Sequence, residues 1–173
     1  MTTDPTVLLV DDSSNDALLM ATVFHRTAFD QPLRFVTSGE EAMAYLKGEG
    51  RYHNRAEFPL PAVVLLDLNM PRKNGLEILE WIRRQPVLRR TCVYILSAST
   101  RREDIDRAYA LGANAYLVKP STLDELSHMA KTLVAWLKLG HFGTVPDGGE
   151  ELEHAATADL PIDADLIDHP WVR

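Results

Sequence analysis

Short apolar stretches alternate with amphipathic stretches five times along the first 139 residues. The apolar stretches are rich in Val, Leu and Ile and are followed by polar residues, a pattern typical of strands buried on both faces of a sheet. Between them, apolar residues recur at the spacing of helices. The alternation predicts an α/β fold: a doubly wound parallel sheet of five strands with helices on both faces, joined by right-handed crossovers. The predicted strands are 6–10, 33–37, 63–66, 91–96 and 115–118, and the predicted helical faces are 17–24, 42–46, 76–82, 105–111 and 123–137.

Chemically active side chains stand where the predicted strands end. Asp11 and Asp12 follow the first strand, Asp67 the third, Ser97 the fourth and Lys119 the fifth. The carboxyl ends of parallel strands share one edge of the sheet, which is where open α/β folds bind ligands. We therefore expect these five side chains to meet in one crevice around Asp67, at the end of the central strand.

Each of these residues also has an ordinary structural explanation. Asp67 could simply end a strand, Asp12 or Ser13 could cap a helix, and Lys119 could be a surface lysine. Ser97 or Ser99 could likewise cap the fourth helix. These explanations weaken when taken together, because each must place a charged or hydroxyl group at the same edge by chance.

Converging carboxylates need a counter-charge. Two unit charges about 4 Å apart interact at roughly 4 kcal/mol at an effective dielectric near 20. A hard divalent cation such as Mg²⁺ offsets this repulsion, while a lysine ammonium and a hydroxyl are suited to hold an anion beside it. The combination favours a phosphoryl-transfer centre with Asp67 as the nucleophile.

Composition argues against two classes of function, DNA binding and membrane association. The net charge of −7 lies in the tail: residues 1–139 carry seventeen acidic and seventeen basic side chains, whereas 140–173 carry eight acidic residues against Arg173. A neutral body without a basic stripe gives no reason to expect DNA binding. No apolar run is long enough to span a membrane and the N-terminus lacks signal-peptide features, so we expect a cytoplasmic protein without membrane contact. The single cysteine, Cys92, is expected to be a buried, inert thiol.

The chain divides at about residue 139. Residues 1–139 form the expected domain, and 140–173 an acidic tail that is extended or docks through its apolar end near Trp171, with no output domain. Within the domain, residues 48–61 make a long connection, and connections of that length are usually functional or mobile.

With these motifs in place, residues 6–139 resemble the receiver domain of two-component response regulators, which are CheY-like. The resemblance rests on four motifs, with five functional positions, in the order and spacing of that family. They are the acidic pair Asp11-Asp12, the phosphoacceptor Asp67, the hydroxyl Ser97 followed by Ala98, and Lys119-Pro120. It implies the flavodoxin-like strand order 2-1-3-4-5.

The resemblance also implies how the site works. Asp67 would accept a phosphoryl group from a phosphohistidine of a sensor histidine kinase. Mg²⁺ would be bound by Asp12, Asp67 and the backbone carbonyl of Asn69, with Asp11 acting through water. Tyr116 would be the switch residue, turning inward when Ser97 moves toward the phosphoryl oxygens, and a cis peptide bond would precede Pro120.

The connection 48–61 and the acidic tail resemble the stand-alone regulators that serve phytochrome-type photoreceptor kinases. The expected partners are therefore a bacteriophytochrome kinase and a downstream protein, reached by contact or by onward phosphotransfer. A homodimer through the fourth and fifth helical region, or through the tail, is a further hypothesis.

Two alternatives remain open at this stage. An aspartyl-phosphate phosphatase would need a second acid two residues after the nucleophile, where this chain has Asn69. A scaffold derived from a receiver that has lost phosphorylation would be expected to lack some of the five functional positions, all of which this chain retains. The favoured reading is a phosphoacceptor that catalyses only its own phosphorylation and dephosphorylation and is otherwise not an enzyme.

Overall fold

The computed structural model of the chain describes residues 6–27 and 33–138. Five parallel strands form one sheet in the order β2-β1-β3-β4-β5, which confirms the predicted fold and strand order. The strands lie within one residue of the predicted positions. They are β1 (Val7–Val10), β2 (Leu33–Val36), β3 (Val63–Leu66), β4 (Cys92–Ser97) and β5 (Ala115–Val118).

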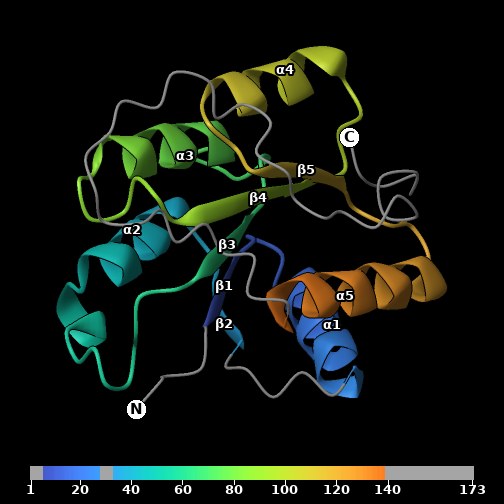
Figure 1. The fold of residues 1–173 in the computed structure, drawn as a ribbon, viewed down its shortest axis with the longest axis horizontal. Helices are drawn as coiled ribbons and strands as arrows, with labels where there is room; N and C mark the ends of the chain where they lie inside the picture. The colour runs from blue at the N-terminus through green and yellow to red at the C-terminus, as the bar shows by residue number, and fades with distance from the viewer. Residues whose placement is uncertain (1–5, 28–32, 139–173) are drawn as a thin grey trace.

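Helices cover both faces of the sheet (Figure 1). On one face lie α1 (Ser14–Arg26) and α5 (Leu123–Lys138), and on the other lie α2 (Gly39–Lys47), α3 (Gly75–Arg84) and α4 (Arg102–Ala110). Successive strand residues point to opposite faces, so Leu65 belongs to the core under α1 and α5 and Leu66 to the core under α2 and α3. β3 is the central strand and all of its residues are buried, which accounts for its apolar composition.

The strand register brings the functional strand ends to one level. Val10 pairs with Leu66, so that Asp11 and Asp67, the next residues, leave neighbouring strands side by side. On the other flank Ser97 pairs with Val118, and the Lys119 amide donates to the Ser97 carbonyl at 2.8 Å. The convergence expected from sequence is therefore a consequence of backbone pairing.

Side-chain caps set the starts of three helices. The Ser13 and Ser38 hydroxyls accept from backbone amides at the starts of α1 and α2. Asn74 is the cap of α3 and forms a reciprocal capping box with Glu77. Gly75 is the first residue of that helix.

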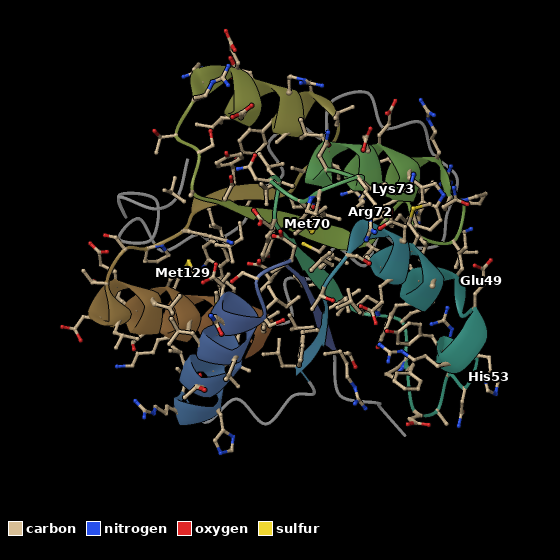
Figure 2. The ribbon with its side chains drawn as sticks, turned by 180° about the vertical axis from the view of Figure 1, so that it is seen from behind. Glu49, His53, Met70, Arg72, Lys73 and Met129 are labelled. Carbon is tan, nitrogen blue, oxygen red and sulfur yellow. The ribbon has the colours of Figure 1, made fainter. Side chains whose placement is uncertain are left out.

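The long connection 48–61 is an ordered part of the fold. It contains a short 3₁₀ helix, Gly50–Tyr52, and packs the rings of Tyr52 and Phe58 against Tyr45 of α2. The Arg55 guanidinium donates to the carbonyl oxygens of Tyr45 and Leu46 in the last turn of α2 and to that of Phe58 in the connection. It therefore links the connection to the C-terminal end of α2. Figure 2 shows this segment, with Glu49 and His53 labelled, at the end of α2 and at the edge of the molecule.

Glu41 fastens the connection to the start of α2. Its carboxylate accepts from the Thr37 amide at 3.0 Å and the Tyr52 hydroxyl at 2.6 Å, and it pairs with Arg51. Burial alone would raise the pKa of Glu41, but the hydrogen bonds from Tyr52 and Thr37 and the charge of Arg51 together lower the pKa below its usual value.

None of the helices in the described ranges is both long enough and apolar enough to cross a bilayer. The predicted tail, 140–173, lies outside the described residues.

We predict that Glu41→Gln costs about 1 kcal/mol of stability at pH 7 and that this difference shrinks in acid. A carboxylate whose pKa is lowered by folding contributes stability above its unfolded pKa, near 4.5, and loses it as the pH falls through the folded value. Urea unfolding of both proteins from pH 7 to pH 3 measures the difference. The matched control is Glu40→Gln, since the neighbouring Glu40 makes one exposed ion pair, with Arg72 at 3.4 Å; an equal response from Glu40→Gln would contradict the role given to Glu41.

Candidate functional site

Three carboxylates meet at the carboxyl edge of the sheet. One oxygen each from Asp11, Asp12 and Asp67 lies within 4.8 Å of the others, the arrangement of a potential metal site. Asp11 and Asp67 are almost fully buried, with 2% and 6% exposed surface, whereas Asp12 is exposed. An ion arriving from solvent would therefore meet Asp12 first.

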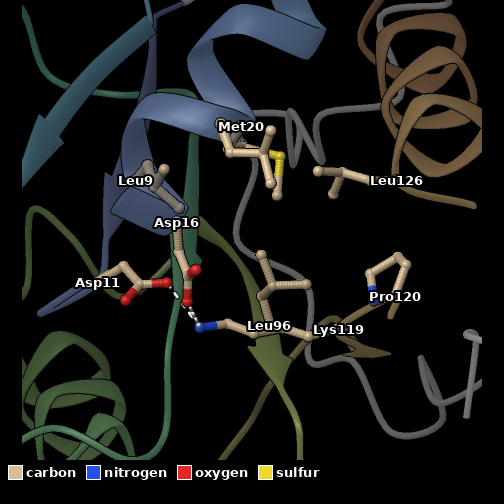
Figure 3. A pocket seen from close by; sticks show the side chains of 9 residues that line it. Leu9, Asp11, Asp16, Met20, Leu96, Lys119, Pro120 and Leu126 are labelled. Atoms are coloured by element: carbon tan, nitrogen blue, oxygen red, sulfur yellow. Dashed lines mark hydrogen bonds and ion pairs between the residues drawn. The ribbon is translucent and has the colours of Figure 1, made fainter. Parts of the chain in front are cut away.

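Lys119 supplies the counter-charge from β5. Its ammonium lies 2.6 Å from Asp11 Oδ2 and 3.4 Å from Asp67 Oδ2. A third carboxylate, that of Asp16 in the first turn of α1, lies 3.6 Å away, and Figure 3 shows Asp11 and Asp16 reaching the same ammonium. Burial alone would lower the pKa of Lys119, but the hydrogen bond to Asp11 and the three negative charges raise it above its usual value, so the side chain is cationic at neutral pH.

The two buried carboxylates have different partners. Asp11 is engaged at both oxygens, because Oδ2 binds Lys119 and Oδ1 accepts from the Ser13 amide at 2.9 Å. Asp67 accepts from the Asn69 amide at 3.3 Å and is more loosely held by Lys119. Of the two, Asp67 is thus the better placed to take a new ligand.

Burial raises the pKa of Asp67 above its usual value. The charge of Lys119 opposes the rise and the neighbouring charge of Asp11 adds to it. The charge of Lys119 is therefore what favours the ionised form of this buried carboxylate.

Ser97 is buried beside this cluster. Its hydroxyl oxygen accepts from the Ser99 amide at 3.1 Å, and the Asn69 side-chain amide approaches it at 3.5 Å. The structure thus places Asn69 between Asp67 and Ser97. The metal contact expected for the Asn69 backbone carbonyl stays a prediction.

Tyr116, the expected switch residue, is fully buried in the core beneath α4. Its hydroxyl donates to the Ser99 carbonyl at 2.9 Å, and its backbone amide donates to the Tyr109 hydroxyl of α4 at 3.1 Å. The ring therefore points inward here, with polar links to the loop after β4. The expected rotation stays a prediction.

The cis peptide bond expected before Pro120 is not found, since every peptide bond in the described residues is trans. A trans bond is the lower-energy form before proline by about 0.5–1 kcal/mol, and Lys119 reaches Asp11 and Asp67 with it. Pro120 instead lines a small cavity of about 90 Å³ behind the site, together with Leu9, Met20, Leu96 and Leu126 (Figure 3).

Gly75 sets the close approach of α3 to the functional loop. A Cβ atom at this position would lie 2.3 Å from the Asp67 carbonyl oxygen and 3.0 Å from Leu68 Cα. The Gly75 amide in turn donates to the Leu68 carbonyl at 3.0 Å. Only glycine allows the start of α3 to hold the backbone of Asp67 in place.

The sequence interpretation missed two of these residues. Asp16 had a detectable signal, since it lies in the first turn of a helix that begins beside the acidic pair. Gly75 gave no comparable signal, because its closeness to Asp67 arises from the packing of α3 and no local sequence pattern encodes it.

Residues 7–131 match the family model described as "Response regulator receiver domain". The chain belongs to this family. The receiver domain therefore spans most of the described residues, and the strand-end cluster lies within the matched range.

Relatives of this receiver domain include regulators named for phytochromes. Response regulator Rcp1 of Synechocystis sp. is 37% identical over 133 residues, covering 76% of this chain and 88% of Rcp1. The structure of Rcp1 in a Mn²⁺-bound form superposes with a TM-score of 0.70. A phosphorylated cyanobacterial phytochrome response regulator, RcpA, gives a TM-score of 0.71 at 34% identity, covering 78% of this chain and 94% of RcpA. The structure of response regulator RPA3017 of R. palustris, from red light signalling, gives a TM-score of 0.73 at 37% identity, covering 83% of this chain and 99% of RPA3017.

We predict that Gly75→Ala destabilises the receiver domain by about 1–3 kcal/mol and weakens divalent-cation binding at the carboxylate cluster. Helix propensity alone makes the opposite prediction, because alanine in a helix is favoured over glycine by up to about 1 kcal/mol. The sign of the change in urea midpoint thus separates packing from propensity, with a Mg²⁺ titration as the second measurement. Stabilisation with unchanged metal affinity would show that α3 does not constrain Asp67.

Proposed function

We propose that this receiver domain accepts a phosphoryl group on Asp67 from a phosphohistidine of a sensor histidine kinase, with Mg²⁺ as cofactor. The observation that carries the proposal is the position of Asp67: a buried carboxylate inside a three-carboxylate cluster and 3.4 Å from a lysine ammonium. Phosphoryl transfer needs positioning and charge neutralisation more than covalent machinery, and this is what the cluster offers.

In the proposed step, an oxygen of Asp67 attacks phosphorus and forms an acyl phosphate. The bond from phosphorus to the donor imidazole nitrogen breaks, and the nitrogen keeps the electron pair. Lys119 lies beside the attacking carboxylate, where its positive charge is suited to pair with the arriving phosphoryl oxygens. Ser97, the hydroxyl next to the site, is the expected second donor.

The residues present fit Mg²⁺. Carboxylate oxygens are hard ligands, and three acids against one ammonium leave negative charge that a divalent cation neutralises. Asp12 and Asp67 would bind directly with the Asn69 carbonyl, and Asp11, already engaged at both oxygens, would act through water. When bound, the ion supplies charge stabilisation for the phosphoryl oxygens in transfer.

The partner we propose is a phytochrome-type kinase. The support is that similar proteins are named as phytochrome response regulators and that the ordered connection 48–61, which suggested this group, is built into the fold through Glu41 and Arg55. Output would pass to a downstream protein by contact or by onward phosphotransfer, without an enzymatic activity beyond the domain's own phosphorylation and dephosphorylation.

We predict that acetyl phosphate with Mg²⁺ labels the wild-type protein on one carboxylate and that Asp67→Asn abolishes the label. Intact-mass spectrometry measures the gain of one phosphoryl group, and beryllofluoride should perturb the resonances of Ser97 and Tyr116 in the wild type alone. Asp106→Asn, an exposed acid on α4 paired with Arg102, is the matched control and should label normally.

Two results would contradict this function. An unlabelled wild type, with both acetyl phosphate and cognate kinases, would indicate a scaffold. Sustained turnover of p-nitrophenyl phosphate well above the rate of acyl-phosphate loss would indicate a phosphatase, even though Asn69 cannot serve as a general acid.

We also predict that the protein forms a homodimer that uses the face made by α4, β5 and α5. Tyr109 and Leu123 there expose 41% and 60% of their surface. Sedimentation velocity of the full chain at micromolar concentration should give a dimer that Leu123→Asp weakens. A monomer under these conditions would dispose of the hypothesis.

A further inference from the structure

Ser99, in the loop after β4, is linked to three parts of the molecule through three different groups. Its amide donates to the Ser97 hydroxyl at 3.1 Å. Its carbonyl accepts from the Tyr116 hydroxyl at 2.9 Å. Its own hydroxyl donates to the Asp104 carboxylate at 2.5 Å. One residue thus connects the hydroxyl of the phosphoryl site, the expected switch tyrosine and the first turn of α4.

Helix α4 combines a small apolar contact, through Ala108 and the partly buried Ile105, with polar contacts at its ends. Of its nine residues only Ala108 is buried, and its cap position, Arg101, makes no side-chain cap hydrogen bond. The hydrogen bond from Ser99 to Asp104 takes the place of a cap, since the Ser99 hydroxyl also accepts from the Arg101 amide at 3.3 Å. The position of the first turn of α4 therefore depends on the conformation of Ser99.

The groups around Ser97 limit where its hydroxyl can donate. The Ser99 amide donates to the Ser97 oxygen at 3.1 Å, and the Asn69 side-chain nitrogen lies 3.5 Å from it. The Ser97 proton is therefore left to point toward another acceptor, the neighbouring Tyr116 hydroxyl or an anion on Asp67. Asp104 is a charged acceptor for the Ser99 hydroxyl, and this bond holds the loop in the conformation in which the Ser99 amide faces Ser97.

We propose that Asp104, acting through Ser99, is a positioning residue for the Ser97 hydroxyl and couples an anion on Asp67 to the first turn of α4. This inference rests on the proposed function and adds the route by which the site reaches a surface helix. Coupling of this kind is reciprocal, so an anion at Asp67 must stabilise the bond from Ser99 to Asp104 by the same factor by which that bond favours the anion.

The test uses beryllofluoride with Mg²⁺ as the anion probe on the full chain. Ser99→Ala and Asp104→Asn should each weaken beryllofluoride binding about tenfold, a difference of about 1.4 kcal/mol, while Mg²⁺ affinity stays unchanged because neither residue belongs to the carboxylate cluster. The double variant should bind like Ser99→Ala, since without the Ser99 hydroxyl the side chain at position 104 has no bond to Ser99 left to weaken. Ser99→Thr keeps the hydroxyl and should restore most of the affinity.

Amide exchange supplies the reciprocal measurement. Beryllofluoride should slow exchange at the first-turn amides of α4 in the wild type and not in Asp104→Asn. Asp106→Asn is the matched control, because it removes the same charge from the same helix at an exposed residue that pairs with the exposed Arg102. It should leave both readouts at the wild-type level.

The outcomes separate the two proposals. A wild type that binds no beryllofluoride contradicts the phosphoacceptor function itself. A wild type that binds it, with Ser99→Ala and Asp104→Asn binding equally well and α4 exchange unchanged, contradicts the coupling alone. Equal losses in Asp106→Asn would show a general effect of charge on α4 and would also overturn it.

Discussion

Mutual repulsion among carboxylates is the constraint around which this protein is built. Asp11, Asp12 and Asp67 lie close enough to share one ion, and two of them are buried, where water cannot screen them. Left alone, these like charges would repel one another and move apart. Lys119, at the end of β5, prevents this by binding Asp11 closely and Asp67 loosely. The looser contact leaves Asp67 as the member of the cluster with capacity for a new partner.

The sheet makes this arrangement possible. Parallel pairing sets Asp11 beside Asp67 and carries Lys119 past Ser97, so backbone hydrogen bonds determine which side chains meet. Helix α3 then fixes the loop after Asp67, because Gly75 lets its first turn lie against the Asp67 carbonyl. Apolar burial on both faces supplies the rigidity that holds like charges together. The site is thus kept in place by groups that take no part in its chemistry.

Sequence reasoning succeeded where local pattern and topology decide the outcome. The apolar run that ends at Asp67 predicted a central strand, and the polar residues at the strand ends predicted one cluster, which the structure contains. It failed where packing decides. The hydrogen bonds of Ser99 to α4, the contact of Asp16 with Lys119 and the anchoring of 48–61 by Arg55 join residues through their three-dimensional neighbours, which no spacing encodes. The cis bond expected before Pro120 came from family resemblance alone, and the trans bond found there leaves Lys119 in reach of its partners.

A crystal structure of the protein grown with Mg²⁺ and beryllofluoride would test the central claim most directly. The account predicts beryllium on an Asp67 oxygen, the ion on oxygens of Asp12 and Asp67 at about 2.0–2.1 Å, and the Lys119 ammonium turned from Asp11 toward a fluorine atom. An anion bound away from Asp67, or a Lys119 ammonium that stays on Asp11 and makes no contact with the anion, would contradict it.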